Sequence, residues 1–242
     1  MIVGAYEYMP PYFVFRMRKY FFLLLISVGL NCIAQTKQQL RDSLKNASNE
    51  LSFHPDSIDL RLKKAGWNIQ LEEWRKAKDE YDIVLKTHPT NIAALYFRAF
   101  VNEKLGRYNF ARLDYENLLL LVPGNFEGQL GLALLNQKDK HYTEAYDQLN
   151  RLCNQFPDSA VAYAARAGME LERNMLELAE YDYSEALKRD PQQTDYLLNR
   201  VEIRLRLGKH KEAREDLDSL LALGISKGEL REYYKRIKRG ER

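Results

Sequence analysis

Cysteine is almost absent from this chain, with two residues among 242. Cys32 lies in an N-terminal segment that we expect to be removed or lipidated, which leaves Cys153 alone in the rest of the sequence. A single cysteine cannot form an internal disulfide, so the chain is not a disulfide-stabilised scaffold even in an oxidising compartment. Its stability must therefore come from packing.

Neither a large excess of one charge nor a long apolar run is present. The chain has 37 Lys and Arg against 34 Asp and Glu, and a formal charge of +3 is too small to indicate a nucleic-acid-binding surface. The marked apolar run at residues 20–30 is about half of the roughly 20 residues that a membrane-spanning helix needs. We therefore expect no nucleic-acid partner, and membrane contact only through a lipid attached at Cys32.

The N-terminus has the pattern of a secretory signal peptide. Basic residues at positions 16, 18 and 19 precede the apolar run, and Cys32 and Ala34 supply small residues for cleavage before Gln35. The sequence thus predicts a signal peptide over residues 1–34, for which Met17 is a cleaner start than Met1. The mature protein is then exported, to the periplasm if the source is bacterial, or to the extracellular space.

Cys32 leaves a second interpretation open. Acylation of this cysteine after cleavage would tether the protein to a membrane as a lipoprotein. Gly29 and Asn31 match poorly the residues that this processing needs, so simple cleavage before Gln35 is the favoured prediction. An uncleaved N-terminal anchor is the third interpretation.

Proline recurs at a fixed interval beyond the signal region. Steps of 34 residues separate Pro55, Pro89, Pro123, Pro157 and Pro191. A constant period of this length is the signature of a solenoid built from repeated units. Counted from the third residue after each proline, the repeats begin at Ile58, Ile92, Phe126, Ala160 and Thr194.

Small residues recur at two positions of this repeat. Position 20 is alanine in every unit, and position 8 is alanine in four units and Val201 in the fifth, while position 24 is always Tyr or Leu. This pattern resembles the tetratricopeptide-repeat (TPR) signature, in which small residues at positions 8 and 20 let two helices approach closely. Leu105-Gly106 and Leu207-Gly208 match the turn between the helices in that family.

The resemblance implies an all-α fold, a right-handed α-solenoid of five TPR helical hairpins over residues 55–225. Each repeat has apolar residues at helical spacing on two segments, and neither segment can bury its apolar stripe alone. Gly106, Asn174 and Gly208 lie between the segments, where a left-handed residue ends a helix. A polar helix within residues 35–54 and a charged helix within residues 226–242 are expected to cap the two ends, because an exposed repeat end is a sticky apolar surface.

Two positions of the repeat vary together. Position 7 reads Lys64, Arg98, Leu132, Arg166 and Arg200, and position 23 reads Glu80, Asp114, Gln148, Asp182 and Asp216. Where position 7 is basic, position 23 is acidic, and where it is Leu the acid has become Gln. We predict structural ion pairs across each hairpin, joining Arg98 to Asp114, Arg166 to Asp182, and Arg200 to Asp216. The alternative is that these arginines line a site for an acidic ligand.

No motif for catalysis, a cofactor or a metal is recognisable. The sequence contains no HExxH, GxGxxG, GxxxxGK[ST] or GxSxG pattern. His54 and His88 directly precede repeat prolines, where a charged imidazole favours the end of a helix. Cys153 is expected to be a buried apolar residue rather than a nucleophile. We therefore expect no enzyme activity, no cofactor and no metal.

An apolar cluster is expected on the first helices of repeats 2 and 3. In TPR proteins these helices line a concave surface, and the resemblance places Tyr96, Phe100, Leu130 and Leu134 on it. Aromatic anchors in a groove suit a bound peptide or helix. The alternative is that these four side chains pack against a neighbouring repeat.

Together these features predict a protein–protein interaction scaffold of the cell envelope that binds a peptide or helix of another protein in its groove. A membrane-tethered lipoprotein component of an envelope assembly or export complex is the alternative. The sequence indicates neither an oligomeric state nor the identity of the partner.

Overall fold

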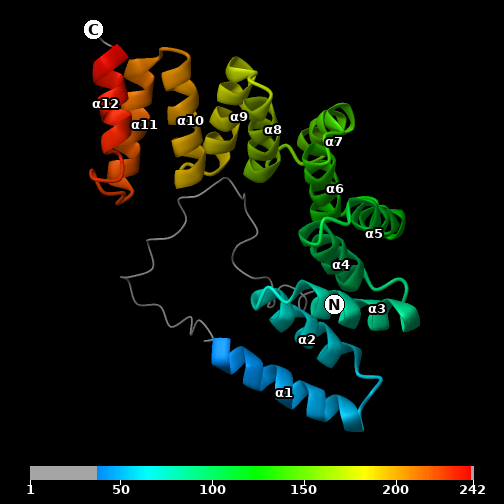
Figure 1. The fold of residues 1–242 in the computed structure, drawn as a ribbon. Coiled ribbons are helices and arrows are strands. Elements are labelled where there is room, and N and C mark those ends of the chain that lie inside the picture. The colour runs from blue at the N-terminus through cyan, green and yellow to red at the C-terminus, as the bar shows by residue number, and fades with distance from the viewer. Residues whose placement is uncertain (1–36, 241–242) are drawn as a thin grey trace. The chain divides into compact units, whose positions relative to one another are not determined.

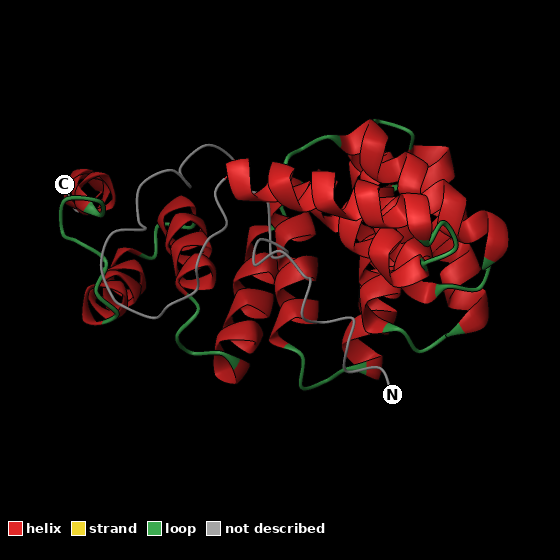
Figure 2. Cartoon of the chain, turned by 90° about the horizontal axis from the view of Figure 1, so that it is seen from below, coloured by secondary structure: helices red, strands yellow, loops and turns green. Residues whose placement is uncertain are grey.

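The computed structural model describes residues 37–240, which form twelve α-helices and no strand (Figures 1 and 2). The expected signal peptide over residues 1–34, together with Met17, Cys32 and Gln35, lies outside the described residues. Within residues 37–240, no helix combines the length and the hydrophobicity that crossing a bilayer requires.

Ten of the described helices form five consecutive hairpins. Their first helices are α2 (Ile58–Gln70), α4 (Ile92–Lys104), α6 (Phe126–Lys138), α8 (Ala160–Glu172) and α10 (Thr194–Arg206). Their second helices are α3 (Trp74–Thr87), α5 (Tyr108–Leu121), α7 (Tyr142–Gln155), α9 (Leu176–Arg189) and α11 (His210–Ala222). Each first helix begins at the residue from which the 34-residue repeat is counted, and the predicted all-α fold of paired helices is confirmed.

The small residues of the repeat lie where the two helices of a hairpin meet. All ten residues at repeat positions 8 and 20, nine alanines and Val201, are 0% exposed. The larger residues at position 24 are buried beside them, from Tyr81 in α3 to Leu217 in α11. A larger side chain at position 8 or 20 would hold the helices apart, because a packed interior has no spare volume.

Every hairpin turn contains one residue in the left-handed conformation. These residues are Glu72, Gly106, Lys140, Asn174 and Gly208, with φ between 59° and 73°. The next residue donates its N–H to the carbonyl five positions earlier, at 2.8 Å in each repeat, which is the hydrogen bond of a Schellman ending. The sequence indicates three of these positions, and Glu72 and Lys140 adopt the same conformation without glycine or asparagine.

The chain divides into two compact units, residues 1–123 and 124–242. The described part of the first unit contains α1 to α5. In it, α1 (Lys37–Phe53) packs on α2 and buries Leu40, Ala47 and Leu51.

The described part of the second unit contains α6 to α12, and its last helix, α12 (Arg231–Gly240), packs on α10 and α11. Leu230 and Ile237 are almost wholly buried there, and Tyr233 and Tyr234 pack against the same core. Ser226 and Glu229 precede this helix as a capping box, in which the Glu229 N–H donates to Ser226 Oγ at 3.3 Å and the Ser226 N–H donates to the Glu229 carboxylate at 3.0 Å.

Candidate functional site

The structure brings together the residues of all three predicted ion pairs. Each arginine lies on a first helix and donates from Nε and Nη2 to both carboxylate oxygens of the acid on the second helix. The distances are 2.9 and 2.6 Å for Arg98–Asp114, 2.5 and 2.8 Å for Arg166–Asp182, and 3.0 and 2.6 Å for Arg200–Asp216. All three acids are buried. Such bidentate geometry fixes both helices of a hairpin.

Each of these arginines also has a partner on the second helix of the preceding repeat, which the sequence analysis misses. The remaining nitrogen, Nη1, donates to Asp82 (2.9 Å), Asn150 (2.9 Å) and Ser184 (3.0 Å) from Arg98, Arg166 and Arg200 respectively. These acceptors share repeat position 25, which is Asp, Glu, Asn, Ser and Asp in the five repeats. Each of these residues can accept a hydrogen bond, but the residue type changes from repeat to repeat. No single residue type therefore identifies position 25 as the partner of the arginine.

The arginine donors are therefore engaged within the repeat array. Burial lowers the pKa of Arg98, but the hydrogen bonds and charges of Asp114 and Asp82 outweigh burial and raise that pKa above its ordinary value. A guanidinium that contacts two helices has little capacity left for a ligand. The geometry favours the structural role of these residues over a site for an acidic ligand.

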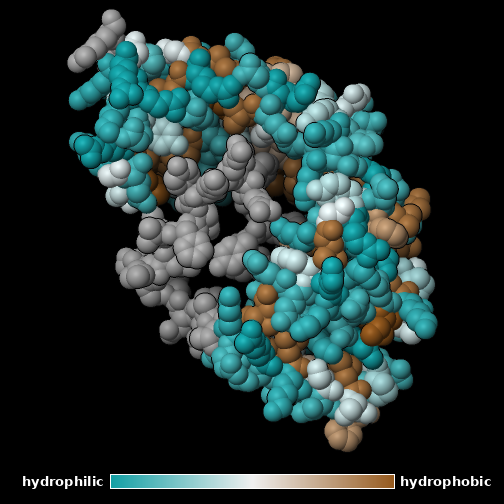
Figure 3. All heavy atoms as spheres, in the orientation of Figure 1, coloured by the Kyte–Doolittle hydropathy of each residue, from teal (hydrophilic) through white to brown (hydrophobic). Residues whose placement is uncertain are grey.

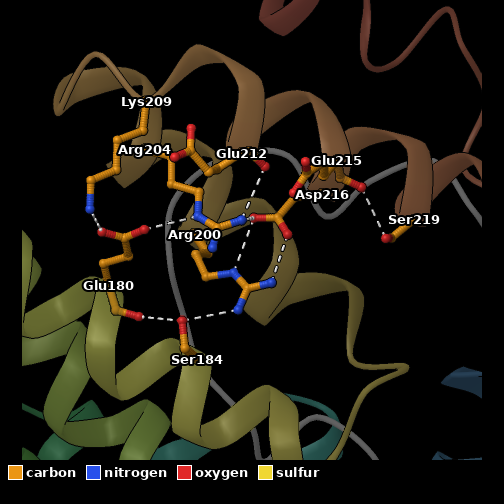
Figure 4. A network of polar contacts seen from close by, with 9 residues as sticks. All are labelled: Glu180, Ser184, Arg200, Arg204, Lys209, Glu212, Glu215, Asp216 and Ser219. Carbon is orange, nitrogen blue, oxygen red and sulfur yellow. Dashed lines mark hydrogen bonds and ion pairs between the residues drawn. The ribbon is translucent and has the colours of Figure 1, made fainter.

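Repeat 5 extends this arrangement into a larger network of charges (Figure 4). Arg204 in α10 lies between two carboxylates, donating to Glu180 of α9 at 3.0 Å and to Asp216 of α11 at 2.8 Å. Lys209 donates to the other oxygen of Glu180 at 2.5 Å. Although burial raises the pKa of Glu180, these two cations outweigh it and lower the pKa overall.

In the first unit, the predicted groove residues divide between core and surface. Tyr96 is only 6% exposed, because its ring packs edge-on against Tyr115 of α5 with centroids 6.0 Å apart. Tyr96 is thus a core residue rather than a groove anchor. Phe100 is partly exposed and meets Trp74 of α3 edge-on at 6.0 Å, with the Lys104 ammonium 4.9 Å from the Phe100 centroid.

Gly66 occupies, in the first helix of repeat 1, the position that Phe100 holds in repeat 2. A methyl group at Gly66 would meet nothing within 4 Å. The first unit therefore offers an aromatic surface, formed by Trp74 and Phe100, and open space at the same position of the preceding first helix. A short apolar side chain of a ligand fits such a surface.

In the second unit, three leucines at groove positions remain partly exposed on first helices. Leu130 and Leu134 lie on α6, whereas Leu198 of α10 packs against the buried core of this unit. Gly168, which holds in α8 the position of Leu134, is buried. The last groove position, Glu202, is engaged by α12, whose Arg236 donates to its two carboxylate oxygens at 2.5 and 3.1 Å. The predicted cluster is thus divided, with Phe100 in one unit and Leu130 with Leu134 in the other.

A second apolar surface, which the sequence analysis does not identify, lies on α5. Phe110, Leu113 and Leu120 are more than half exposed, at 54%, 52% and 79%. On the face drawn in Figure 3, apolar side chains form scattered patches among hydrophilic ones. These α5 side chains provide a comparison surface for tests of the first helices.

The described residues contain no arrangement that points to metal or thiol chemistry. No group of three or more His, Cys, Asp or Glu side chains within residues 37–240 is placed to hold a metal ion. Burial raises the pKa of the Cys153 thiol to about 11, so the unreactive protonated form predominates at neutral pH. Cys153 lies in α7 as a packed side chain, 3% exposed.

Comparison with known proteins agrees with the repeat geometry. Two family models described as tetratricopeptide repeat match residues 127–159 and 170–227. Human tetratricopeptide repeat protein 6 is 27% identical over 167 residues, which is 69% of this chain and 31% of that protein. The chain therefore spans less than a third of this curated relative.

Solved structures show the same fold at low sequence identity. A tetratricopeptide repeat protein from Parabacteroides merdae is 23% identical with a TM-score of 0.66, over 84% of this chain and 79% of that one. PilW, described as a type IV pilus biogenesis factor, is 20% identical with a TM-score of 0.68, over 78% of this chain and 89% of PilW. At these identities the likeness establishes the arrangement of helices.

Proposed function

The chain is a tetratricopeptide-repeat protein, and from this premise we propose that it is an interaction scaffold whose first helices bind a peptide or helix of another protein. The observation that carries the proposal is the partial exposure of Phe100 on α4 and of Leu130 and Leu134 on α6, at positions 5 and 9 of the repeat. The opposite sides of the same helices are buried in the hairpins, so these side chains are available to a partner.

The mechanism that we propose is binding to a preorganised surface. Phe100 is held by Trp74, and the Arg98–Asp114 pair joins α4 to α5, so little conformational freedom is lost when a partner binds. Within the second unit, Leu130 and Leu134 lie one helical turn apart on α6, a spacing that suits the apolar face of an amphipathic helix or the side chains of an extended peptide.

A binding test compares the first helices with α5. Phe100→Glu and Leu134→Glu place a charge on the proposed surface in each unit, and Leu113→Glu and Leu120→Glu place the same charge on α5. A photo-crosslinking residue at position 74 or 130 should capture a partner from the native compartment, and capture should fail when Phe100→Glu or Leu134→Glu, respectively, is added. Loss of the partner in the α5 variants alone would move the binding surface to the second helices.

We further propose that the protein is exported and acts in an envelope assembly or export complex. The support is the basic segment before the apolar residues 20–30 and the small residues Cys32 and Ala34. PilW, which shares the fold, is described as a type IV pilus biogenesis factor, and that description belongs to PilW.

Mass spectrometry of the mature N-terminus tests export and separates its two forms. A chain that begins at Gln35 supports simple cleavage, and an acylated Cys32 supports the lipoprotein tether. A chain that retains residues 1–34 and remains in the cytoplasm would refute the proposed location.

A further inference from the structure

Position 11 of the repeat holds a polar side chain that in three repeats donates a hydrogen bond to the second helix. The Asn102 amide donates to Asp114 at 3.3 Å, the Asn136 amide donates to Gln148 at 2.9 Å, and Arg204 donates to Asp216 at 2.8 Å. In three repeats, therefore, position 11 supplies hydrogen to an acceptor at position 23.

Repeat 4 has a carboxyl group at this position. Glu170 in α8 is 2% exposed, and its carboxyl lies near enough to the buried carboxylate of Asp182 in α9 to experience its negative charge. Both oxygens of Asp182 already accept hydrogen bonds from Arg166. An ionised Glu170 would have no hydrogen to donate, whereas a protonated Glu170 supplies one as Asn102 and Asn136 do.

Repeat 5 has a cation, Arg204, at the repeat position that Glu170 occupies in repeat 4, and the groups around Glu170 do not replace it. In repeat 5, Arg204 lies between the carboxylates of Glu180 and Asp216 (Figure 4). In repeat 4, Tyr146 of α7 corresponds to Glu180, and its hydroxyl donates to Glu170 Oε1 at 3.2 Å. The other Glu170 oxygen, Oε2, is buried and has no partner within the described residues.

The titratable and charged groups that face Glu170 come from three helices. They are Tyr146 and Cys153 on α7, Arg166 on α8, and Asp182 and Tyr183 on α9. Only Arg166 is a cation, and it is already bound to Asp182 and to Asn150. Two adjacent carboxylates would therefore share one guanidinium if Glu170 were ionised.

We propose that Glu170 is a protonation switch: a proton held between Glu170 and Asp182 fastens α8 to α9, and its release to solvent loosens this junction. Burial, followed by the charge of Asp182, raises the pKa of Glu170 to about 7. In the unfolded chain the pKa of a glutamate is about 4.3. The folded chain therefore binds the proton more tightly than the unfolded chain does, and the resulting stability is lost as the pH rises from about 4.3 through 7.

Thermal unfolding of the full chain and of Glu170→Gln tests the switch. The amide imitates the protonated acid and cannot ionise. We expect the two melting temperatures to be similar at pH 5 and the variant to melt higher by about 5 °C at pH 8, with the difference growing as the pH rises to about 7 and levelling off above it. Melting temperatures that differ by a constant amount at every pH would overturn the proposal.

Glu172→Gln is the matched control, because Glu172 is an exposed carboxylate two residues further along α8. Its effect should not change between pH 6 and pH 8. Carbon-13 NMR of the Glu170 side-chain carboxyl in the unaltered protein provides a measurement that needs no variant. A titration midpoint near 7 supports the switch, and a midpoint near 4.3 refutes it.

Discussion

At the scale of single residues, the arginines at repeat position 7 connect three helices each. Arg98 lies on α4, binds Asp114 on α5, and binds Asp82 on α3 of the preceding repeat. Lone ion pairs on a surface contribute little to stability. Here the acid is buried, so removing one partner leaves a charge without compensation.

Removing the charge of Asp114 should destabilise the protein. Asp114→Gln keeps an acceptor for Asn102 but leaves Arg98 with Asp82 alone, and we expect a loss of about 2 kcal/mol in the free energy of unfolding. The double variant Arg98→Leu with Asp114→Gln recreates the combination of Leu132 and Gln148 in repeat 3. It should recover at least half of that loss, as measured by urea denaturation.

The unaltered protein, the single variants Arg98→Leu and Asp114→Gln, and the double variant together form a double-mutant cycle. A coupling energy near zero between Arg98 and Asp114 would mean that the contact is incidental to stability.

Comparison among the repeats within one sequence predicts these residue contacts only where the chemistry repeats. Positions 7 and 23 change together, which predicts the pairing of Arg166 with Asp182. Position 25 alternates among carboxylate, amide and hydroxyl, so its contact with the same arginine has no constant signature. The burial of Tyr96 depends on the position of the Tyr115 ring, which the repeat pattern does not specify.

At the scale of helices, the turns of all five hairpins have one geometry despite different residues. A residue with a Cβ in the left-handed conformation costs about 1 kcal/mol relative to glycine. Lys140, with φ of 65°, carries this cost between α6 and α7, whereas Gly106, with φ of 71°, avoids it between α4 and α5.

Lys140→Gly should therefore stabilise the protein by about 1 kcal/mol. Gly106→Ala should lower the free energy of unfolding by a similar amount, and the cause is backbone strain alone because a methyl group at Gly106 meets nothing within 4 Å. Chemical denaturation measures both changes. Effects of the same sign at the two positions would contradict the argument from backbone conformation.

The boundaries of the helices are largely predictable from the period of the prolines. Each proline prevents the preceding second helix from continuing, and the next first helix begins three residues later, as at Pro89 and Ile92. Glycine and asparagine reveal the turn residue in three repeats. In the other two, the packing of the two helices of the hairpin outweighs the preference of Glu72 and Lys140 for a negative φ.

At the scale of the whole molecule, the second unit depends on α12 to close its core. Ile237 is 0% exposed and belongs to the same apolar cluster as Leu217 and Leu220 of α11. In a repeat array each element contacts its neighbours, so damage at one end remains local until the array unfolds.

Ile237→Ala should cost about 3 kcal/mol, since it leaves a cavity in this cluster. Hydrogen exchange should become faster in α10, α11 and α12 and remain unchanged in α1 to α5. Lys238→Ala, at an exposed position of the same helix, is the control and should have no effect. Equal acceleration of exchange in both units would show that they unfold as one.

Each position-7 arginine binds one residue sixteen places before it and another sixteen places after it. The hydrogen bonds that join neighbouring hairpins thus come from a stretch of chain shorter than one 34-residue repeat. A gene segment of 34 codons copied in tandem would encode both the hairpin and the arginine contacts that join it to the preceding hairpin. Lengthening of the array by duplication then requires no new contact between repeats to evolve.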